Sequence, residues 1–273
     1  MATRVDRDQM VALLSEEFAA LTAMCRSFDD ADWAVPTCLP GWTVKDQLSH
    51  LAGTERMLAG EPPPAAVVVE ADYLKNDLGR ANEVWVEANR ALPGSEVLAG
   101  FEEVAGRRLR ALEAMTQADF DKPSWTPVGR DETYGRFMRI RHYDCFLHEH
   151  DIRQALGLAD RDDPAHVRSA LEETAAAIGY IVGRKAAMPA GARVRIQLTG
   201  SIEATYLVAV NGRAQLVEHL EGGPTTGIRL PVMLFLRLSG GRAEASSETS
   251  AEIVLEGDTA LAAQLVENLA LTI

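Results

Sequence analysis

Three of the six histidines in the chain lie close together, in the stretch RHYDCFLHEHD at residues 141–151. Within it, Asp144 and His148 are four positions apart, and residues at that spacing lie on the same face of a helix. A carboxylate and an imidazole on one helix face can bind the same divalent metal ion. The pair therefore predicts two ligands of a metal site, provided that this stretch is helical.

A third ligand must come from another helix, and His50 is the only histidine well inside an earlier predicted helix. Two ligands from one helix and one from a neighbour leave coordination positions open, as a catalytic site requires. A mixed imidazole and carboxylate set favours zinc, with nickel, iron and manganese as alternatives. The same spacing is common on solvated helices, so an ordinary ion pair between Asp144 and His148 stays open as the structural alternative.

The other histidines, the neighbouring cysteine and the tryptophans are interpreted without a role in chemistry. His150 lies two positions from His148, so it faces away and is assigned to the surroundings of the site or to the surface. Cys145 is interpreted as a buried packing residue. The same ordinary reading applies to His142, His166 and His219, and the tryptophans are expected to anchor the core: Trp33, Trp42, Trp85 and Trp125.

The residues that must position this site are predicted to be helical over roughly the first 185 positions. Apolar residues recur at steps of three and four from residue 10 to 25 and from 98 to 115, as in amphipathic helices. Thr43 and Asp46 have the spacing of a capping box, so a helix carrying His50 is expected to begin there. A further helix is predicted over 134–156, with Gly157 as its C-terminal cap. Long helices with short connections indicate an antiparallel bundle.

The pattern changes near Ala192, where apolar and polar residues begin to alternate as in β-strands. Asn211-Gly212 between two such runs predicts a tight hairpin. A strand is expected at 253–255 and a helix after Asp258. The short apolar run at 231–238 fits a buried helix or a strand, and a helix is favoured. The predicted fold class is α+β, with a helical bundle over residues 1–187 and a smaller α+β domain over 188–273.

Composition restricts the partners and the compartment. The chain has 273 residues, of which 47% are apolar, and a formal net charge of −13. Such a charge repels polyanions, so nucleic acid and anionic membrane surfaces are not expected as partners. No segment approaches the ~20 apolar residues that span a bilayer, and the N-terminus does not resemble a secretory signal. The three cysteines show no paired spacing, so a protein of the reducing cytoplasm is expected. The expected oligomeric state is a monomer or a homodimer.

Two segments resemble the signatures of the mycothiol-dependent maleylpyruvate isomerase family. They are WAVPTCLPGWTVKDQLSHLAG at residues 33–53 and DCFLHEHDIRQALG at residues 144–157. The resemblance implies a DinB-like four-helix bundle that binds a metal, followed by a sterol-carrier-like C-terminal domain. It places the metal triad on His50, Asp144 and His148, with Asp144 where the family pattern has glutamate. It also matches the functional arginine of the C-terminal domain to Arg242.

The resemblance implies an enzyme in which a divalent metal, foremost zinc, activates the thiolate of mycothiol. The reaction would be the isomerisation of a small electrophilic substrate or its conjugation to the thiol, with Arg242 holding a substrate carboxylate. The expected partners are therefore a small-molecule substrate and a low-molecular-weight thiol. Two alternatives remain open: a hydrolase that uses metal-bound water, and a non-catalytic protein that binds a small apolar ligand.

Overall fold

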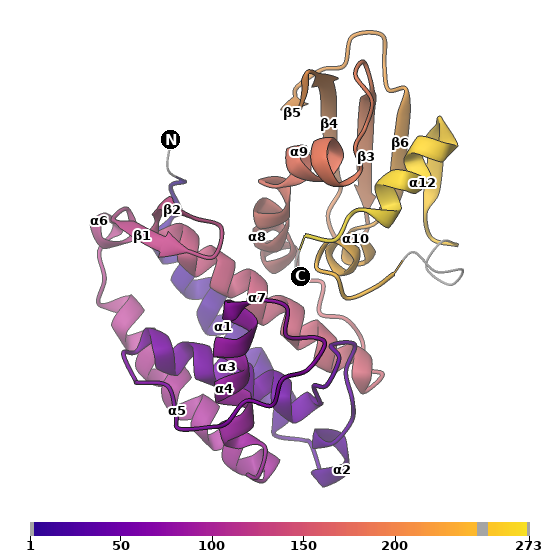
Figure 1. Ribbon diagram of the computed structural model, residues 1–273. Helices are drawn as coiled ribbons and strands as arrows, with labels where there is room; N and C mark the ends of the chain where they lie inside the picture. Colours follow the sequence, from indigo (N-terminus) through magenta and orange to yellow (C-terminus); the bar gives the residue numbers. More distant parts are fainter. Residues whose placement is uncertain (1–2, 245–250, 272–273) are drawn as a thin grey trace. The chain divides into compact units, whose positions relative to one another are not determined.

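The computed structural model describes residues 3–244 and 251–271 of the chain. It divides into two compact units, Met1–Arg161 and Asp162–Ile273. Helices make up the first unit apart from one small hairpin, and a five-stranded sheet with helices makes up the second (Figure 1). The α+β fold class is therefore confirmed.

Four long helices form the body of the first unit: α1 (Arg7–Cys25), α3 (Val44–Leu58), α5 (Gly94–Glu113) and α7 (Tyr134–Ala155). Helix α4 (Asp77–Asn89) packs against α3. The short helices α2 (Asp30–Trp33) and α6 (Gln117–Phe120) and the hairpin of β1 (Pro123–Thr126) and β2 (Gly129–Thr133) complete it. Apolar side chains from the long helices meet in one core, in which the rings of Phe18 and Phe101 pack edge to face.

The ends of the two helices that matter most for the site are set by local sequence. At the start of α3, the Thr43 side chain accepts from the Asp46 backbone N–H, while the Asp46 carboxylate accepts from the Thr43 N–H at 2.8 Å. Helix α7 is capped by Thr133 at its start and is followed by Gly157, whose φ of 65° suits glycine. Both predicted boundaries are confirmed, so the helices that carry the candidate ligands begin and end where the sequence indicates.

The second unit is built on a sheet in the order β5-β4-β3-β6-β7, in which only the β3–β6 pair is parallel. The strands are β3 (Arg193–Thr199), β4 (Ala204–Asn211), β5 (Arg213–Val217), β6 (Thr226–Pro231) and β7 (Val254–Gly257). The predicted hairpin at Asn211-Gly212 joins β4 to β5. Helices α10 (Val232–Ser239) and α12 (Thr259–Glu267) pack against β6, and the unit begins with α8 (Pro164–Ala175), α9 (Ile178–Tyr180) and the π-helix η1 (Ile181–Lys185).

Two sequence expectations differ from the structure. The sequence predicts a domain boundary after residue 187, whereas the two units divide after Arg161. The boundary lies earlier because α8 packs against α10 of the sheet unit. Trp125 was expected in the core but is 50% exposed, so that prediction is wrong. It lies on β1 of a two-stranded hairpin, where successive side chains point to opposite faces and one face meets solvent.

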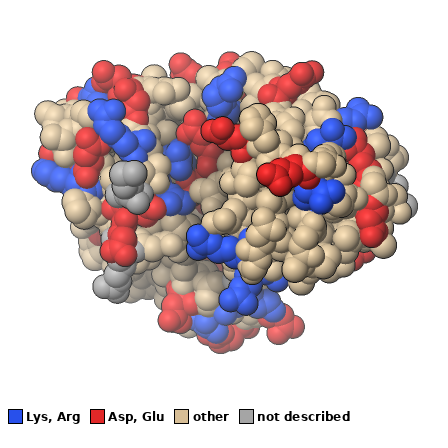
Figure 2. Space-filling model, turned by 90° about the horizontal axis from the view of Figure 1, so that it is seen from above, with Lys and Arg blue, Asp and Glu red and all other residues tan. Residues whose placement is uncertain are grey.

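The charged side chains and the apolar helices of the described residues bear on the expectations drawn from composition. Acidic and basic side chains are interspersed over the face of the molecule drawn in Figure 2. The surplus of 40 Asp and Glu over 27 Lys and Arg is thus not gathered into one patch on that face. Within the described ranges, no helix combines the length and the apolar character that a membrane crossing requires.

Candidate metal centre

The three predicted ligands lie together, although they come from two helices. His50 on α3 places its Nε2 3.2 Å from Oδ2 of Asp144 on α7, and Nε2 of His148 lies 3.5 Å from Oδ1 of the same carboxylate. The candidate ligand atoms of all three residues lie within 4.8 Å of one another. The predicted juxtaposition is therefore present, and the metal-binding role of the three residues stays a prediction.

His148 is oriented by polar groups on its far side. Its Nδ1 contacts Oε1 of Gln47 and lies 3.4 Å from Oδ2 of Asp151. Gln47 in turn donates to Oγ1 of Thr37 at 2.7 Å, and the Cys38 thiol donates to Asp151 at 3.2 Å. Holding one ring nitrogen in this way leaves the other turned towards Asp144, an arrangement common behind metal-binding histidines. Sequence reasoning did not identify these supporting residues.

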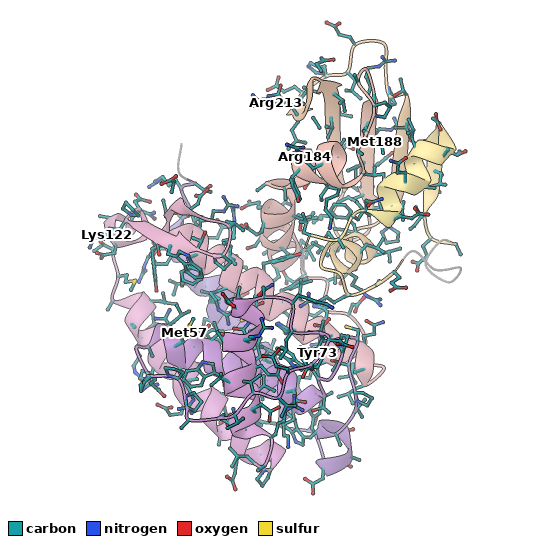
Figure 3. All side chains as sticks on the ribbon, viewed as in Figure 1. Met57, Tyr73, Lys122, Arg184, Met188 and Arg213 are labelled. Carbon is teal, nitrogen blue, oxygen red and sulfur yellow. The ribbon has the colours of Figure 1, made fainter. Side chains whose placement is uncertain are left out.

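An aromatic side chain covers the imidazoles. The Trp42 ring lies 5.3 Å from the His50 ring and stacks on the His148 ring at 6.0 Å and 29°. The indole N–H of Trp42 donates to the buried carboxylate of Glu83 at 2.8 Å. The same carboxylate accepts at 3.0 Å from the hydroxyl of Tyr73, which is labelled in Figure 3. Both imidazoles are buried, whereas the Asp144 side chain is 30% exposed. Asp144 is therefore the member of the three through which the candidate centre meets solvent.

The charge states of these groups suit metal binding. Burial would raise the pKa of Asp144, but Arg141 and the two imidazoles outweigh it and hold that pKa well below its usual range. The Arg141 guanidinium donates directly to Oδ2 of Asp144. Burial lowers the pKa of His50. At neutral pH the carboxylate is thus ionised and His50 is neutral, which are the forms that bind metals.

The donor set fits a divalent metal. Two imidazoles and one carboxylate form a three-ligand set of the kind that zinc adopts in open catalytic sites. His50 Nδ1 is buried with no hydrogen-bond partner among the described residues. Among these residues, the hydrogen bond that orients the His50 ring is therefore the contact of its Nε2 with Asp144.

Comparison with known proteins supports the family inferred from the two signatures. The family model described as the mycothiol maleylpyruvate isomerase N-terminal domain matches residues 14–153, about half of the chain. The chain belongs to this family. The match runs from α1 to α7, so it includes both helices that carry the candidate ligands.

Solved structures agree on the fold. The crystal structure of the mycothiol-dependent maleylpyruvate isomerase and that of a point mutant each superpose with a TM-score of 0.61, at 15% identity, over 94% of this chain and 96% of theirs. At that identity the likeness shows the fold alone. Two uncharacterised proteins from Mycobacterium tuberculosis strains, CDC 1551 / Oshkosh and H37Rv, are 28% identical over 160 residues, which is 56% of this chain and 58% of theirs. The alignment thus spans less than two thirds of those relatives.

The remaining candidate residues of this family member lie away from the triad or in the other unit. His150 is buried, not on the surface, and its Nδ1 donates to the Phe146 carbonyl at 2.7 Å. Arg242 follows α10 in the second unit, where its guanidinium donates to the Gly240 carbonyl at 2.6 Å. Its role in holding a substrate carboxylate stays a prediction.

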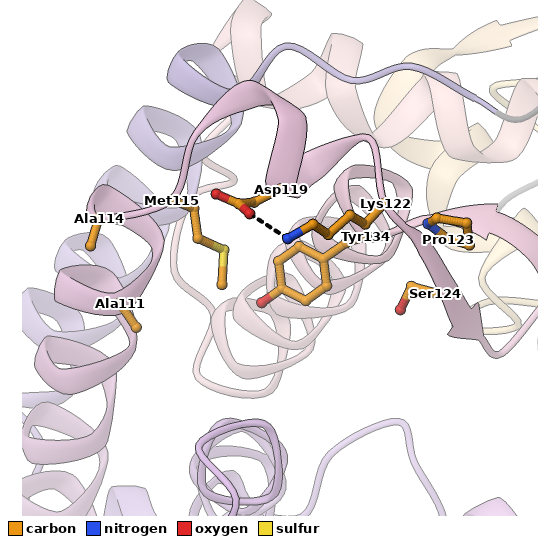
Figure 4. A pocket seen from close by; sticks show the side chains of 8 residues that line it. All are labelled: Ala111, Ala114, Met115, Asp119, Lys122, Pro123, Ser124 and Tyr134. Carbon is orange, nitrogen blue, oxygen red and sulfur yellow. Dashed lines mark hydrogen bonds and ion pairs between the residues drawn. The ribbon is translucent and has the colours of Figure 1, made fainter.

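A separate groove of about 460 Å³ opens in the first unit near the end of α5 (Figure 4). Met115, Lys122 and Tyr134 are among the side chains that line it, and Lys122 pairs with Asp119 at 2.7 Å. None of the three candidate ligands lines this groove. The candidate metal centre and the groove are therefore distinct features of the bundle.

Proposed function

We propose that this protein is a metal-dependent enzyme that uses a low-molecular-weight thiol, mycothiol, to isomerise or conjugate a small electrophilic substrate bearing a carboxylate. The observation that carries the proposal is the convergence of His50, Asp144 and His148 from two helices, with Asp144 partly open to solvent. Membership in a family named for a mycothiol maleylpyruvate isomerase domain supports the choice of thiol and reaction class.

His50, Asp144 and His148 would hold the metal, and zinc matches their donor atoms best. A divalent ion bound there would supply the Lewis acidity that keeps a thiol in its thiolate form at neutral pH. Trp42 covers the imidazole rings and excludes water from that side. The support behind His148 holds its ring in one orientation, so the ligand set is arranged before any substrate arrives.

The thiolate supplies the chemistry of both reactions. In isomerisation, it adds to one carbon of the substrate double bond, and the electron pair of that bond moves onto the conjugated carbonyl. The former double bond rotates as a single bond, the electron pair returns, and the thiolate leaves unchanged. In conjugation, the same attack expels a leaving group and the carbon–sulfur bond remains. Arg242 would bind the substrate carboxylate with its planar fork of donors.

Metal analysis joined to a thiol-dependent assay tests the proposal. The native protein should contain about one equivalent of metal, and the His148→Ala variant should contain far less, because it loses one of three ligands. Turnover of maleylpyruvate or of an activated aryl halide should require both the metal and added mycothiol. Turnover without thiol would favour a hydrolase instead, and protein that neither contains nor takes up metal would refute the proposal.

A further inference from the structure

Four buried or partly buried charges form a continuous chain that leads away from the candidate metal centre. Arg108 on α5 donates from Nε to Oε2 of Glu55 on α3 at 3.0 Å. The other oxygen of Glu55 accepts from Nε of Arg141 on α7 at 3.1 Å, and Arg141 donates onward to Oδ2 of Asp144. The charges alternate from Arg108 to Asp144, so each arginine lies between or beside carboxylates and the formal charge of the chain is zero.

Burying these charges costs desolvation free energy, so the chain is a poor way to stabilise the fold. Glu55, Arg108 and Arg141 are 2%, 4% and 4% exposed. Ion pairs buried this deeply contribute little net stability, because desolvation of the charges offsets their attraction. The chain ends on Asp144, the one member with a substantially exposed side chain. Because its last member, Asp144, also contacts His50 and His148, the chain links the buried arginines directly to the candidate metal centre.

We propose that Glu55 is a positioning residue for the metal centre, acting through Arg141 on Asp144. Glu55 anchors Arg141, and Arg141 fixes the carboxylate of Asp144 by binding its Oδ2. The negative charge of Glu55 also offsets the positive charge that Arg141 places beside a site for a divalent cation. The inference rests on the proposed metal centre, since a positioning role requires that Asp144 bind the ion.

The outer end of the chain reaches the groove at the end of α5. Nη2 of Arg108 donates to the hydroxyl of Tyr134 at 3.1 Å, and Tyr134 lines that groove (Figure 4). The contact is a hydrogen bond and not an ion pair, so Tyr134 orients Arg108 without adding to the alternating charges of the chain. The phenol is therefore expected to contribute much less than Glu55 to the properties of the metal centre.

Replacing Glu55 by glutamine tests the central member with little change in shape. The two arginines donate to different oxygens of Glu55, and in glutamine one of these positions is an NH₂ donor that would face an arginine. Arg141 then keeps its positive charge but loses the negative charge of Glu55, so Asp144 is its remaining anionic partner in the chain. Partners behind metal ligands typically contribute about 10- to 100-fold to metal affinity. Because Glu55 acts one contact further back, through Arg141, the Glu55→Gln variant should bind Zn²⁺ about 10-fold more weakly than the wild type, at the lower end of that range.

The measurement is Zn²⁺ affinity by competition with a chromophoric chelator, together with the visible absorption of the Co²⁺-loaded protein. Tyr134→Phe should change Zn²⁺ affinity less than threefold. Adding Arg108→Met to Glu55→Gln should not recover the affinity, because Arg141 still lacks the carboxylate that anchors it, and recovery would overturn the positioning role. Glu149→Gln is the matched control. Like Glu55, Glu149 is a buried carboxylate that pairs with arginine, but it lies on α7 outside the chain from Arg108 to Asp144. It should retain wild-type Zn²⁺ affinity and Co²⁺ absorption.

The outcomes separate this inference from the proposed function. If the wild type binds no Zn²⁺, the metal centre and the positioning role fall together. If the wild type binds Zn²⁺ and folded Glu55→Gln binds it equally well, the positioning role alone is refuted. Should Glu55→Gln not fold, Arg141→Lys provides the second test, because lysine keeps the charge but cannot bridge two carboxylates with a fork. Wild-type Zn²⁺ affinity and Co²⁺ absorption in Arg141→Lys would likewise overturn the inference.

Discussion

Arg161 joins two fully buried glutamates from different helices, and its removal is predicted to destabilise the bundle strongly. Nη2 of Arg161 contacts both Glu17 on α1 and Glu149 on α7, and both carboxylates have 0% exposure. A second arginine, Arg153, contacts Glu149 at 2.7 Å from one turn further along α7. The informative change is Arg161→Met, which keeps an apolar stem of similar length and removes the guanidinium.

The size of the effect follows from the pKa of Glu149. Burial would raise it, but Arg161 outweighs burial, and the pKa falls from an ordinary 4.5 to about 2. At about 1.4 kcal/mol per pKa unit, this corresponds to about 3 kcal/mol of stability at neutral pH. Removing one partner of a buried ion pair typically costs about 3–5 kcal/mol. We therefore expect Arg161→Met to lose about 3–5 kcal/mol of unfolding free energy at pH 7.

The same pKa fixes the sign of the pH dependence. A carboxylate whose pKa is lower in the folded state contributes stability that is fully present above its unfolded pKa, near 4.5. That stability is lost as the pH falls towards 2, where the folded carboxylate also becomes protonated. In Arg161→Met the pKa of folded Glu149 loses its main lowering influence and should rise towards its ordinary value. The difference in stability between wild type and variant should therefore shrink steadily from pH 5 to pH 2.

Urea unfolding followed by circular dichroism at several pH values measures both quantities. Arg153→Met is the matched control, because Glu149 keeps Arg161 in that variant. Its loss at pH 7 should be clearly smaller, about 1 kcal/mol, because Arg153 pairs with Glu149 alone, whereas Arg161 pairs with both Glu17 and Glu149. A loss below about 1 kcal/mol for Arg161→Met, or a difference from wild type that does not change with pH, would refute the argument.

Two further predictions concern the metal and the packing of α3. Removing bound zinc with a chelator should lower the melting temperature of the wild type, because an ion that binds only the folded state stabilises it; the same treatment should leave His148→Ala unchanged. Gly53→Ala should lose about 1–3 kcal/mol of unfolding free energy, since an added Cβ would lie 2.3 Å from Cβ of Trp85. Calorimetry checks the first, and urea unfolding checks the second, with a wild-type value for Gly53→Ala contradicting that close packing.

The parts of the fold that could be predicted are those whose signals are local in sequence. The capping box of Thr43 and Asp46, the helix end at Gly157 and the hairpin at Asn211-Gly212 each depend on residues a few positions apart, and all three are confirmed. The spacing of Asp144 and His148 belongs to the same class, because helical geometry alone puts them on one face.

The surroundings of the site could not be predicted, because they depend on contacts between distant residues. Gln47 meets His148 across 101 positions, and Glu55 meets Arg141 across 86. Neither glutamine nor glutamate carries a sequence pattern that distinguishes a supporting residue from one on the surface. His50 could be selected only because no other histidine lay inside an earlier helix, and the hairpin that exposes Trp125 gave no comparable signal.

Helix α7 carries two ionic networks whose separation follows from helical spacing. Arg141, Asp144, His148 and Asp151 succeed one another at steps of three and four, so they share the face that meets α3. Glu149 and Arg153 are also four apart, but Glu149 follows His148 directly and is turned about 100° around the axis from it. The network of Glu149 therefore reaches Glu17 on α1 through Arg161 and includes neither His50 nor His148. Substitutions on that face should change the stability of the bundle while leaving metal affinity intact, and substitutions along the Glu55 chain should change metal affinity.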